Sequence, residues 1–277
     1  MPALPQIAQS FIISAGASQQ IIVLYFFAFG FSQLFYGPLS DSLGRRKIFI
    51  FGQALFVAGC ALAYFAANPS ELMAARILQG LGAGAPLIIS RALLSDAYSG
   101  SALSQALASL GIATSVAAVV GPILGGAITT GFGWQSVFGV LTVYLGLTLL
   151  VGCVMLSRSS ASNMKGVSLA SIVRQYKGFS QNLSLISVAA HKWLLTFLLL
   201  ITVAFLPFEL QGKLGLTAAQ YGYYLILPSL GPIVGSVLVK MCLRVYSAQM
   251  LLAVFSQLIL LAGLIFILAP LSVFNLM

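Results

Sequence analysis

The sequence predicts an all-α, polytopic transmembrane helical bundle, and composition is the first reason. Of the 277 residues, 60% are apolar and only 6% are charged. An ordinary soluble domain has roughly 25% charged residues, so a surface this poor in charge does not suit water. The apolar residues also gather in stretches of about 20, the length that a helix needs to cross a bilayer. Finally, the basic residues lie between these stretches, as topology signals do.

Polar links divide the apolar stretches into groups. Most links are short, but one long link covers residues 157–192. We therefore predict an N-terminal transmembrane half at 1–156, a cytoplasmic linker at 157–192 and a partial C-terminal half at 193–277. The predicted spans are residues 19–38, 48–67, 70–94, 103–130, 134–156, 193–210, 218–239 and 248–269.

The net charge of +9 at pH 7 would suggest a nucleic-acid partner in a soluble protein. Here the basic residues fall on alternate links, while the opposite links hold Lys213 and little else. Because basic loops remain in the cytoplasm, we expect these links to be cytoplasmic and the lipid bilayer to be the partner. The basic positions are Arg45, Arg46, Lys47, Arg91, Arg158, Lys165, Arg174, Lys177, Lys192, Lys240 and Arg244.

One charged segment between two predicted spans is unusual. From Gly37 to Lys47 it runs Gly-Pro-Leu-Ser-Asp-Ser-Leu-Gly-Arg-Arg-Lys. Asp41 stands four residues before Arg45, within pairing reach on a helical turn, and Gly44 permits a tight turn. Taken alone, these residues describe a basic cytoplasmic loop that fixes topology. Their full spacing resembles the loop signature between the second and third helices of the major facilitator superfamily.

Two further segments resemble motifs of the same superfamily. Arg76–Gly84 is similar to its fourth-helix motif, and Gly121–Gly126 is similar to the fifth-helix motif of its exporters. Together with residues 30–41 and 2–8, they resemble the drug:proton antiporter branch, which includes bicyclomycin-resistance and multidrug-resistance proteins of bacterial inner membranes. The resemblance implies an inner-membrane exporter that exchanges protons for a small lipophilic, drug-like substrate.

The resemblance also implies a fold of twelve helices in two six-helix halves around a central path. The segment that ends the first helix in the family falls at the start of this sequence, and the last predicted span, 248–269, which corresponds to the family's ninth helix, ends shortly before Met277. We therefore expect a partial major facilitator fold, truncated at both ends, with a stub of helix I and helices II–IX. In this branch the first helix supplies a membrane-embedded acid, so the sequence leaves the proton-carrying acid unassigned.

The resemblance implies a charge network of Asp41, Arg45 and Asp96 that stabilises an outward-open state. Chains of this branch often place an arginine before the last of these acids, where this sequence has Ser95, so we expect a thinner network. The candidate gate residues are Gly37, Asp41, Gly44, Arg45, Arg46, Lys47 and Asp96.

Arg76 is a charge inside a predicted span. Placing a charge at the bilayer centre costs about 2.5–3.5 kcal/mol on insertion scales, so this side chain needs a partner or water. It could extend to the interface past the lipid. The alternative is an inward orientation, because Gly80 and Gly84 continue its helix face and favour close packing. The resemblance implies that Arg76 takes part in proton coupling, with Gln79 as its neighbour.

The fifth-helix motif predicts close helix packing. Ala113, Ala117, Gly121 and Gly125 recur every four residues and form a smooth face. Pro122 removes one backbone donor and favours a bend. The resemblance implies that this interface prevents leakage during alternating access. Its candidate residues are Gly121, Pro122, Gly125 and Gly126.

Aromatic side chains share one face of the first span and recur near the start of the span at 218–239. Such a face suits a permissive apolar pocket, and it equally suits ordinary packing or an interfacial belt. Glu209 could attract cationic substrates, carry a proton or have no role. The candidate substrate-facing residues are Tyr25, Phe29, Ser32, Tyr36, Glu209 and Tyr224.

Two classes of function follow from these features. The first is a proton-coupled multidrug exporter that works by alternating access and is incomplete in this chain. The second is a non-transporting truncated membrane protein or an assembly partner. An uptake permease of the same superfamily is disfavoured by Gly121–Gly126. An enzyme is not expected, because the sequence has one histidine and offers no nucleophile–base pair or metal-ligand cluster. We expect no cofactor and no metal, and the oligomeric state stays open.

Overall fold

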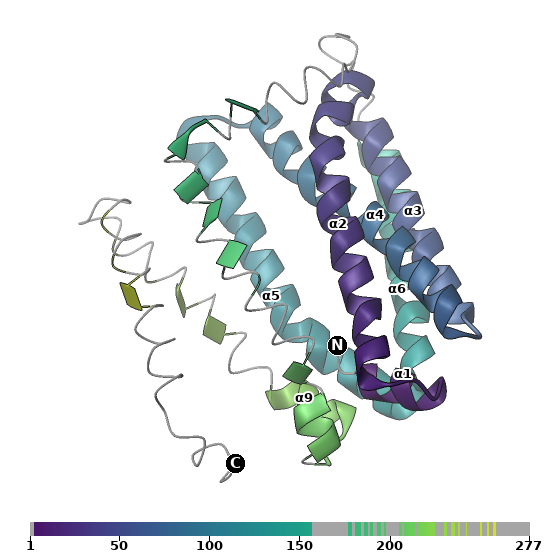
Figure 1. Cartoon of the computed structure of the whole chain (residues 1–277). Coiled ribbons are helices and arrows are strands. Elements are labelled where there is room, and N and C mark those ends of the chain that lie inside the picture. Colours follow the sequence, from purple (N-terminus) through teal and green to yellow (C-terminus); the bar gives the residue numbers. More distant parts are fainter. Residues whose placement is uncertain are drawn as a thin grey trace.

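The structure is a computed structural model of the whole chain (Figure 1). It describes residues 3–156 without a gap and, beyond them, a set of shorter pieces. These pieces are residues 177–178, 181–183, 186–187, 189–190, 193–194, 197, 205–206, 208–213, 215–224, 230–231, 234–235, 238, 242, 250, 254 and 257–258. In this part of the chain every regular element is a helix and no strand occurs, so the predicted all-α class is confirmed.

Helices α2 to α6 form the N-terminal part, and each is long and apolar enough to cross a membrane, α5 over Gln105–Phe132. They match the first five predicted spans. A short helix α1 precedes them, and the π-helix η1 and helix α9 follow them. The bounds are α1 Leu4–Ser10, α2 Ala15–Leu43, α3 Arg45–Phe65, α4 Pro69–Ala97, α5 Gly100–Phe132, α6 Trp134–Met155, η1 Phe208–Lys213 and α9 Ala218–Tyr224.

Several helices extend beyond their apolar stretches. The link expected at 40–47 is helical on both sides of Gly44, which has φ 95° and separates α2 from α3. Only glycine adopts such a φ without strain, so one residue suffices for the turn. Gly133, with φ 82°, separates α5 from α6 in the same way. The predicted spans at 193–210, 218–239 and 248–269 are described only in part, and the described pieces include η1 and α9.

Side-chain caps explain where two of the long helices begin. The Ser14 hydroxyl accepts a hydrogen bond from the Ala17 amide at 3.1 Å and starts α2. Asn68 does the same for the Glu71 amide at 2.9 Å, and the Glu71 carboxylate accepts one from the Ala67 amide at 2.8 Å. This reciprocal arrangement satisfies amides that have no partner within the first turn of α4.

Helix α4 lies between α2 and α3 and makes extensive contacts with both. Glycines permit this approach: a Cβ on Gly82 would lie 2.7 Å from the Gly52 carbonyl oxygen, and one on Gly80 would lie 2.8 Å from the Ala28 Cβ. Because such distances are too short for real atoms, any larger side chain here would push the helices apart. The backbones of α2, α3 and α4 therefore pack directly against one another at glycine positions, as in other membrane bundles.

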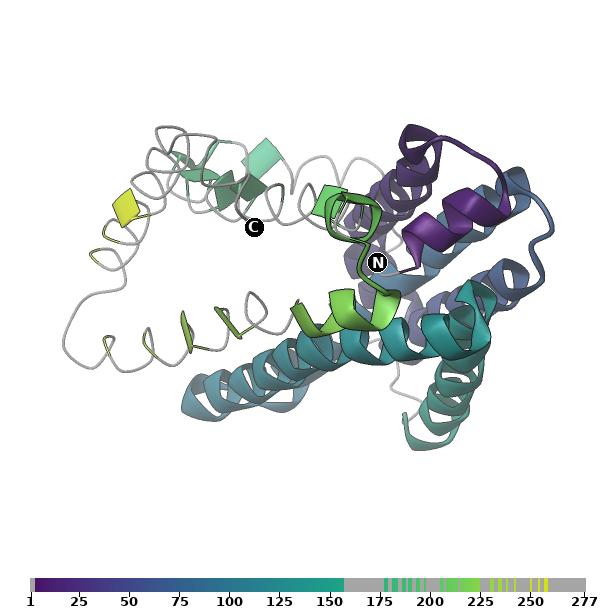
Figure 2. The same ribbon diagram turned by 90° about the horizontal axis from the view of Figure 1, so that it is seen from below.

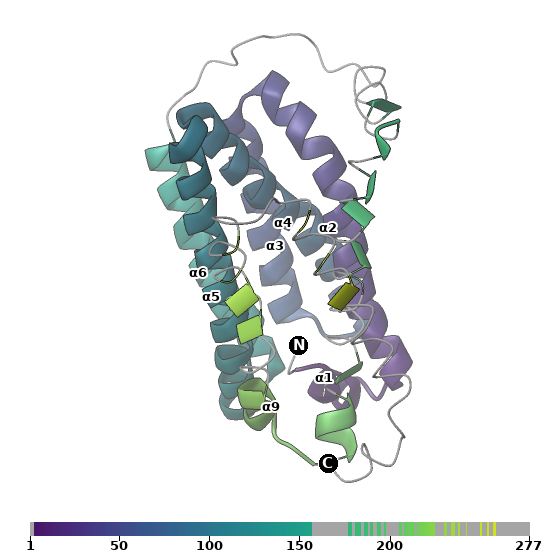
Figure 3. The ribbon, with the colours of Figure 1, turned by 90° about the vertical axis from the view of Figure 1, so that its left-hand side faces the viewer.

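Helices α5 and α6 complete the described bundle on the side away from α2 (Figure 3). Helix α6 packs against α3, and α9 lies beside the C-terminal end of α5 (Figure 2). The largest buried apolar cluster joins α1 to the ends of α2, α3, α4 and α6. It contains Ala3, Ile7, Ile21, Ala63, Ala66, Leu72, Ala75, Trp134 and Phe138.

Large apolar side chains cover the outside of the spans. Phe27 is 73% exposed, Phe51 57% and Val154 85%. Such exposure would be costly in water over a continuous surface, whereas hydrocarbon accepts it. The exposed surface thus agrees with the predicted bilayer environment.

Candidate functional site

The ends of α2, α3 and α4 meet at Arg45. This arginine is the first residue of α3, directly after the Gly44 turn, and it forms ion pairs with Asp41 of α2 and Asp96 of α4. Its Nε lies 3.0 Å from the Asp96 Oδ2, and its Nη1 donates to the Ser40 hydroxyl at 2.6 Å. The structure therefore brings together the three charges that the sequence proposes as a network.

Both carboxylates of this cluster face the outside of the protein. The Asp41 and Asp96 side chains are 63% and 53% exposed, whereas Arg45 is 19% exposed. Exposed ion pairs contribute only about 0.2–1 kcal/mol each. These ion pairs therefore contribute little to stability. A single arginine that links three helix ends is better suited to a latch that can open.

The next residue has a different partner. The Arg46 Nη2 donates to the carbonyl oxygen of Cys153 in the last turn of α6, at 2.5 Å. A cation is favourable there because the carbonyl end of a helix carries partial negative charge. The Arg46 Nε is buried and has no hydrogen-bond partner within the described region. Two other candidate gate residues lie in more open surroundings: Lys47 is exposed, and a Cβ on Gly37 would meet no atom within 4 Å. The contact between Arg46 and α6 was not predicted from the sequence.

Arg76 lies inside the bundle, only 3% exposed, in the orientation that Gly80 and Gly84 favour. Its Nε donates to the Ile21 carbonyl of α2 at 3.3 Å, and its Nη1 donates to the Gln79 Oε1 at 2.6 Å. The Gln79 amide in turn donates to the Gly59 carbonyl of α3 at 3.1 Å. This chain of contacts links α2, α4 and α3 through buried polar groups.

The aromatic face of α2 is turned toward α4. The Tyr36 hydroxyl donates to the Leu81 carbonyl of α4 at 2.8 Å. The Ser32 hydroxyl lies 3.4 Å from the Gly80 carbonyl of α4 and also donates within α2, to the Phe29 carbonyl at 2.9 Å. Ser32 and Tyr36 are each 6% exposed, so ordinary packing, one of the open alternatives, describes both in this structure. Tyr25 lies against Arg76, and Phe29 stacks on Tyr25 with ring centroids 6.0 Å apart.

Within the described residues, the smooth face of α5 is open at two of its glycines. A Cβ on Gly121 or on Gly125 would meet no atom within 4 Å in the described structure. The close contact of α5 is made next to that face, where a Cβ on Gly222 of α9 would lie 2.7 Å from the Pro122 carbonyl oxygen. Pro122 belongs to the predicted packing motif and makes this helix contact, in which α9 contributes the small residue. A packing role for Gly121 and Gly125 stays a prediction. Gly126 is buried.

The remaining candidates, Glu209 and Tyr224, lie after the predicted linker. Glu209 belongs to η1, and its side chain lies outside what the structure describes. Tyr224 is the last residue of α9 and is 63% exposed. Phe208 of η1 packs on a cluster formed by Leu4 and Ile22. This cluster and the α5–α9 contact lie at the end of the bundle opposite to the turn between α2 and α3, where Arg45 begins α3 (Figure 1).

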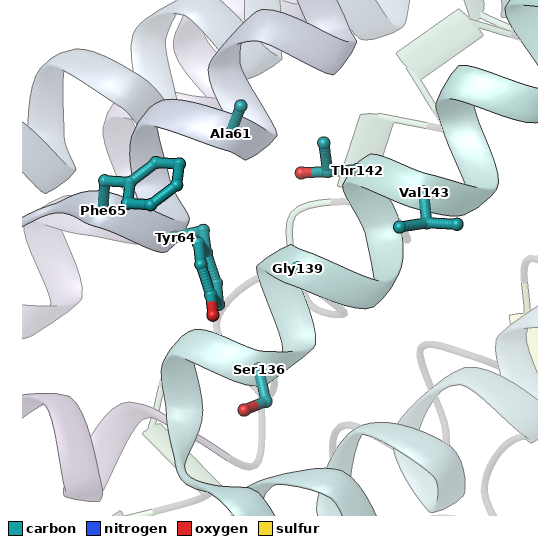
Figure 4. Close-up of a pocket in the computed structure, with 7 residues that line it drawn as sticks. All are labelled: Ala61, Tyr64, Phe65, Ser136, Gly139, Thr142 and Val143. Atoms are coloured by element: carbon teal, nitrogen blue, oxygen red, sulfur yellow. The ribbon is translucent and has the colours of Figure 1, made fainter.

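A shallow apolar groove lies between α3 and α6 (Figure 4). Its volume is about 440 Å³. The Ser136 hydroxyl donates to the Phe132 carbonyl at the end of α5, and the Thr142 hydroxyl donates to the Phe138 carbonyl of α6, both at 2.8 Å, so they offer the groove little polarity. The sequence did not predict this feature. Its lining residues are Ala61, Tyr64, Phe65, Ser136, Gly139, Thr142 and Val143.

Comparison with known proteins places the whole chain in one family. The sequence pattern of the Major Facilitator Superfamily matches residues 1–277. The chain belongs to the Major Facilitator Superfamily. The predicted resemblance and the predicted partial major facilitator bundle are thereby confirmed, and membership places the chain with transporters and not with enzymes.

Relatives within the superfamily agree with the predicted branch. Multidrug resistance protein D of Escherichia coli K12 is 32% identical over 143 residues, which is 52% of this chain and 36% of that protein. Multidrug resistance protein MdtL of Shewanella oneidensis is 28% identical over 273 residues, 97% of this chain and 67% of that protein. Riboflavin transporter RibZ of Clostridioides difficile is 28% identical over 171 residues, 60% of this chain and 38% of that protein. The chain thus spans little more than a third of the length of two of these three relatives.

Proposed function

We propose that this chain acts as a proton-coupled exporter of small lipophilic, drug-like molecules, or as the corresponding part of one. The observation that carries the proposal is the buried Arg76, whose contacts join α2, α3 and α4. An ionisable group inside a membrane bundle is costly and is by default a functional site. The multidrug-resistance relatives support the drug-like class of substrate.

The proposed roles follow the positions of the residues. Arg76 and Gln79 take part in proton coupling. Asp41, Arg45 and Asp96 form a latch at the end that carries the basic residues, which we assign to the cytoplasm of a bacterial cell by the positive-inside rule.

Contacts at the opposite end of the bundle support alternating access. Leu4 and Ile22 pack with Phe208 of η1, and Pro122 of α5 meets Gly222 of α9. Both contacts join the N-terminal helices to elements that follow the predicted linker at 157–192. If the two parts rock against each other, these contacts open.

Inside-out membrane vesicles test the proposal directly. The 277-residue chain is expressed, its insertion is measured, and the lumen is acidified by respiration. Addition of ethidium or tetraphenylphosphonium should then release lumenal protons, seen as recovery of a quenched pH-sensitive dye. Vesicles with the Arg76→Ala variant at equal abundance are the control. Absence of proton release with every lipophilic cation and antibiotic tested, despite full insertion, would favour a non-transporting membrane protein.

A second candidate is a carrier for a vitamin-like substrate. The similarity to Riboflavin transporter RibZ favours it, since that alignment covers 60% of this chain. Right-side-out vesicles separate the two candidates, because an uptake carrier would accumulate labelled riboflavin there. Riboflavin accumulation without any drug-dependent proton release would replace the export proposal.

A further inference from the structure

The ring of Tyr25 supports the buried cation of Arg76. The guanidinium carbon lies 4.2 Å from the ring centroid, so the charge lies over the aromatic face. Tyr25 belongs to α2 and Arg76 to α4. Cation–π attraction is strongest where water is excluded, and Arg76 is only 3% exposed.

Neighbouring rings hold Tyr25 in this position. Phe29, one turn further along α2, stacks on it with an interplanar angle of 7° and centroids 6.0 Å apart. Phe26 meets it edge to face at 5.1 Å. These two ring contacts hold the Tyr25 ring independently of Arg76, and α2 presents an aromatic face to α4.

The hydrogen bonds of Arg76 complement this contact. The Ile21 carbonyl accepts from Nε at 3.3 Å and the Gln79 Oε1 accepts from Nη1 at 2.6 Å. Guanidinium N–H groups point outward in the plane of the group, whereas an aromatic face engages the group from above. Ile21 and Tyr25 are one helical turn apart, so α2 contacts the cation both in its plane and from its face.

Gln79, which accepts a hydrogen bond from Arg76, is itself held by contacts with α3. The Gln79 amide donates to the Gly59 carbonyl at 3.1 Å, and a Cβ on Gly59 would lie 2.8 Å from the Gln79 Cγ. Gln79 therefore has little freedom to move. The cation rests between a fixed amide on its own helix and a fixed ring on α2, so any shift of α2 along α4 changes its surroundings.

We propose that Tyr25 is a positioning residue for Arg76. Its ring sets the plane of the guanidinium and favours the charged form inside the bundle, and movement of α2 against α4 alters that support. The proposal rests on the proposed role of Arg76 in proton coupling. Tyr25 itself and Cys60 of α3 are titratable groups that face Arg76, and both are ordinarily neutral at pH 7.

Two substitutions separate the aromatic face from the hydroxyl and from bulk. Tyr25→Phe keeps the face, whereas Tyr25→Met keeps most of the volume without it. Phe27→Met is the matched control, because Phe27 lies on the same helix and is 73% exposed on the outer side. Incorporation of phenylalanines with increasing fluorine substitution at position 25 weakens the face in steps without changing its shape, and it serves if the methionine variant does not insert.

The first readout does not need transport. An arginine-specific dicarbonyl is added to the purified 277-residue chain, and modification of Arg76 is followed by mass spectrometry. Loss of the cation–π contact should raise the modification rate of Tyr25→Met by roughly 3- to 30-fold. Tyr25→Phe and Phe27→Met should stay close to the parent rate, and the fluorinated residues should raise it in order of fluorine content.

The second readout is the pH profile of drug-dependent proton release in inside-out vesicles. Tyr25→Met should displace the profile, whereas Tyr25→Phe and Phe27→Met should not. An unchanged Arg76 modification rate across both the methionine and the fluorinated variants overturns the positioning role. If the parent chain releases no protons with any drug, the proposed function fails, while the modification rates still decide the role of Tyr25.

Discussion

Arg45 at the start of α3 lies with its Nε 3.0 Å from the Oδ2 of Asp96 at the end of α4, although 51 residues separate them. The same guanidinium pairs with Asp41, four residues earlier. The turn at Gly44 makes this geometry attainable, since it directs the first residue of α3 back over the end of α2. One cation thereby holds the ends of α2, α3 and α4 together.

A double-mutant cycle on Arg45→Gln and Asp96→Asn should give a coupling free energy of about 0.2–1 kcal/mol, because the acid is largely exposed. The coupling should fall at high salt. Reversible unfolding of the protein in detergent at low and high ionic strength measures this coupling.

Asp41→Asn should reduce drug-dependent proton release while leaving insertion intact. Transport by Asp41→Asn at the parent rate would remove the latch from the mechanism.

Gln79→Leu should destabilise the bundle by about 1–3 kcal/mol, because the Gly59 carbonyl and one Arg76 donor would lose their buried partner. Unfolding in detergent measures this loss.

Arg76→Lys should not support drug-dependent proton release, since an ammonium group cannot satisfy the Ile21 and Gln79 contacts with the geometry of a planar guanidinium. Proton release by Arg76→Lys at parent rates would show that only the positive charge matters.

Gly82→Ala and Gly30→Ala should have opposite effects on stability. A methyl group on Gly82 would lie 2.7 Å from the Gly52 carbonyl oxygen, so this overpacking should cost about 1–3 kcal/mol. The methyl group on Gly30 would meet no atom within 4 Å, and alanine favours a helix by about 0.5–1 kcal/mol over glycine. Midpoints of thermal unfolding in one detergent compare the two variants. Equal shifts in both would argue against close packing of α4 on α3.

Gly222→Leu should slow transport several-fold without reducing insertion, because a side chain there collides with the Pro122 carbonyl and keeps α9 away from α5. Gly231→Leu is the matched control, since its Cβ would meet nothing within 4 Å. Drug-dependent proton release per inserted molecule is the measurement. The role of the α5–α9 contact in closure is refuted if both leucine variants transport equally well.

The positions of the long helices follow from the sequence. Membrane spans depend on hydropathy over about 20 residues, which is a local property, and all of the first five predicted spans coincide with helices. The predicted ends were less accurate: polar residues such as Asp41 and Asp96 extend α2 and α4 because the helical backbone needs no apolar side chain at its termini.

Contacts between residues far apart in the sequence could be predicted only in part. The inward orientation of Arg76 was indicated by Gly80 and Gly84, because small residues at steps of four mark a packed face. At Gly121 and Gly125 the same argument stays a prediction, because no described atom would lie within 4 Å of a Cβ there, and the described contact of α5 with α9 is made by the Pro122 carbonyl. Small-residue spacing shows that a face can be packed but not which helix reaches it.

The order of residues was enough to specify the membrane environment, the helical class, the superfamily and the pairing of Asp41 with Arg45, because each depends on local composition or on spacing within one segment. Tertiary structure alone assigned the Arg46 donor to the Cys153 carbonyl, 107 residues away, and the Tyr25 ring to the face of Arg76. Backbone carbonyls are present on every helix, and aromatic side chains are present on several of them. Only the rotation and depth at which two helices pack determine which of them a buried cation meets.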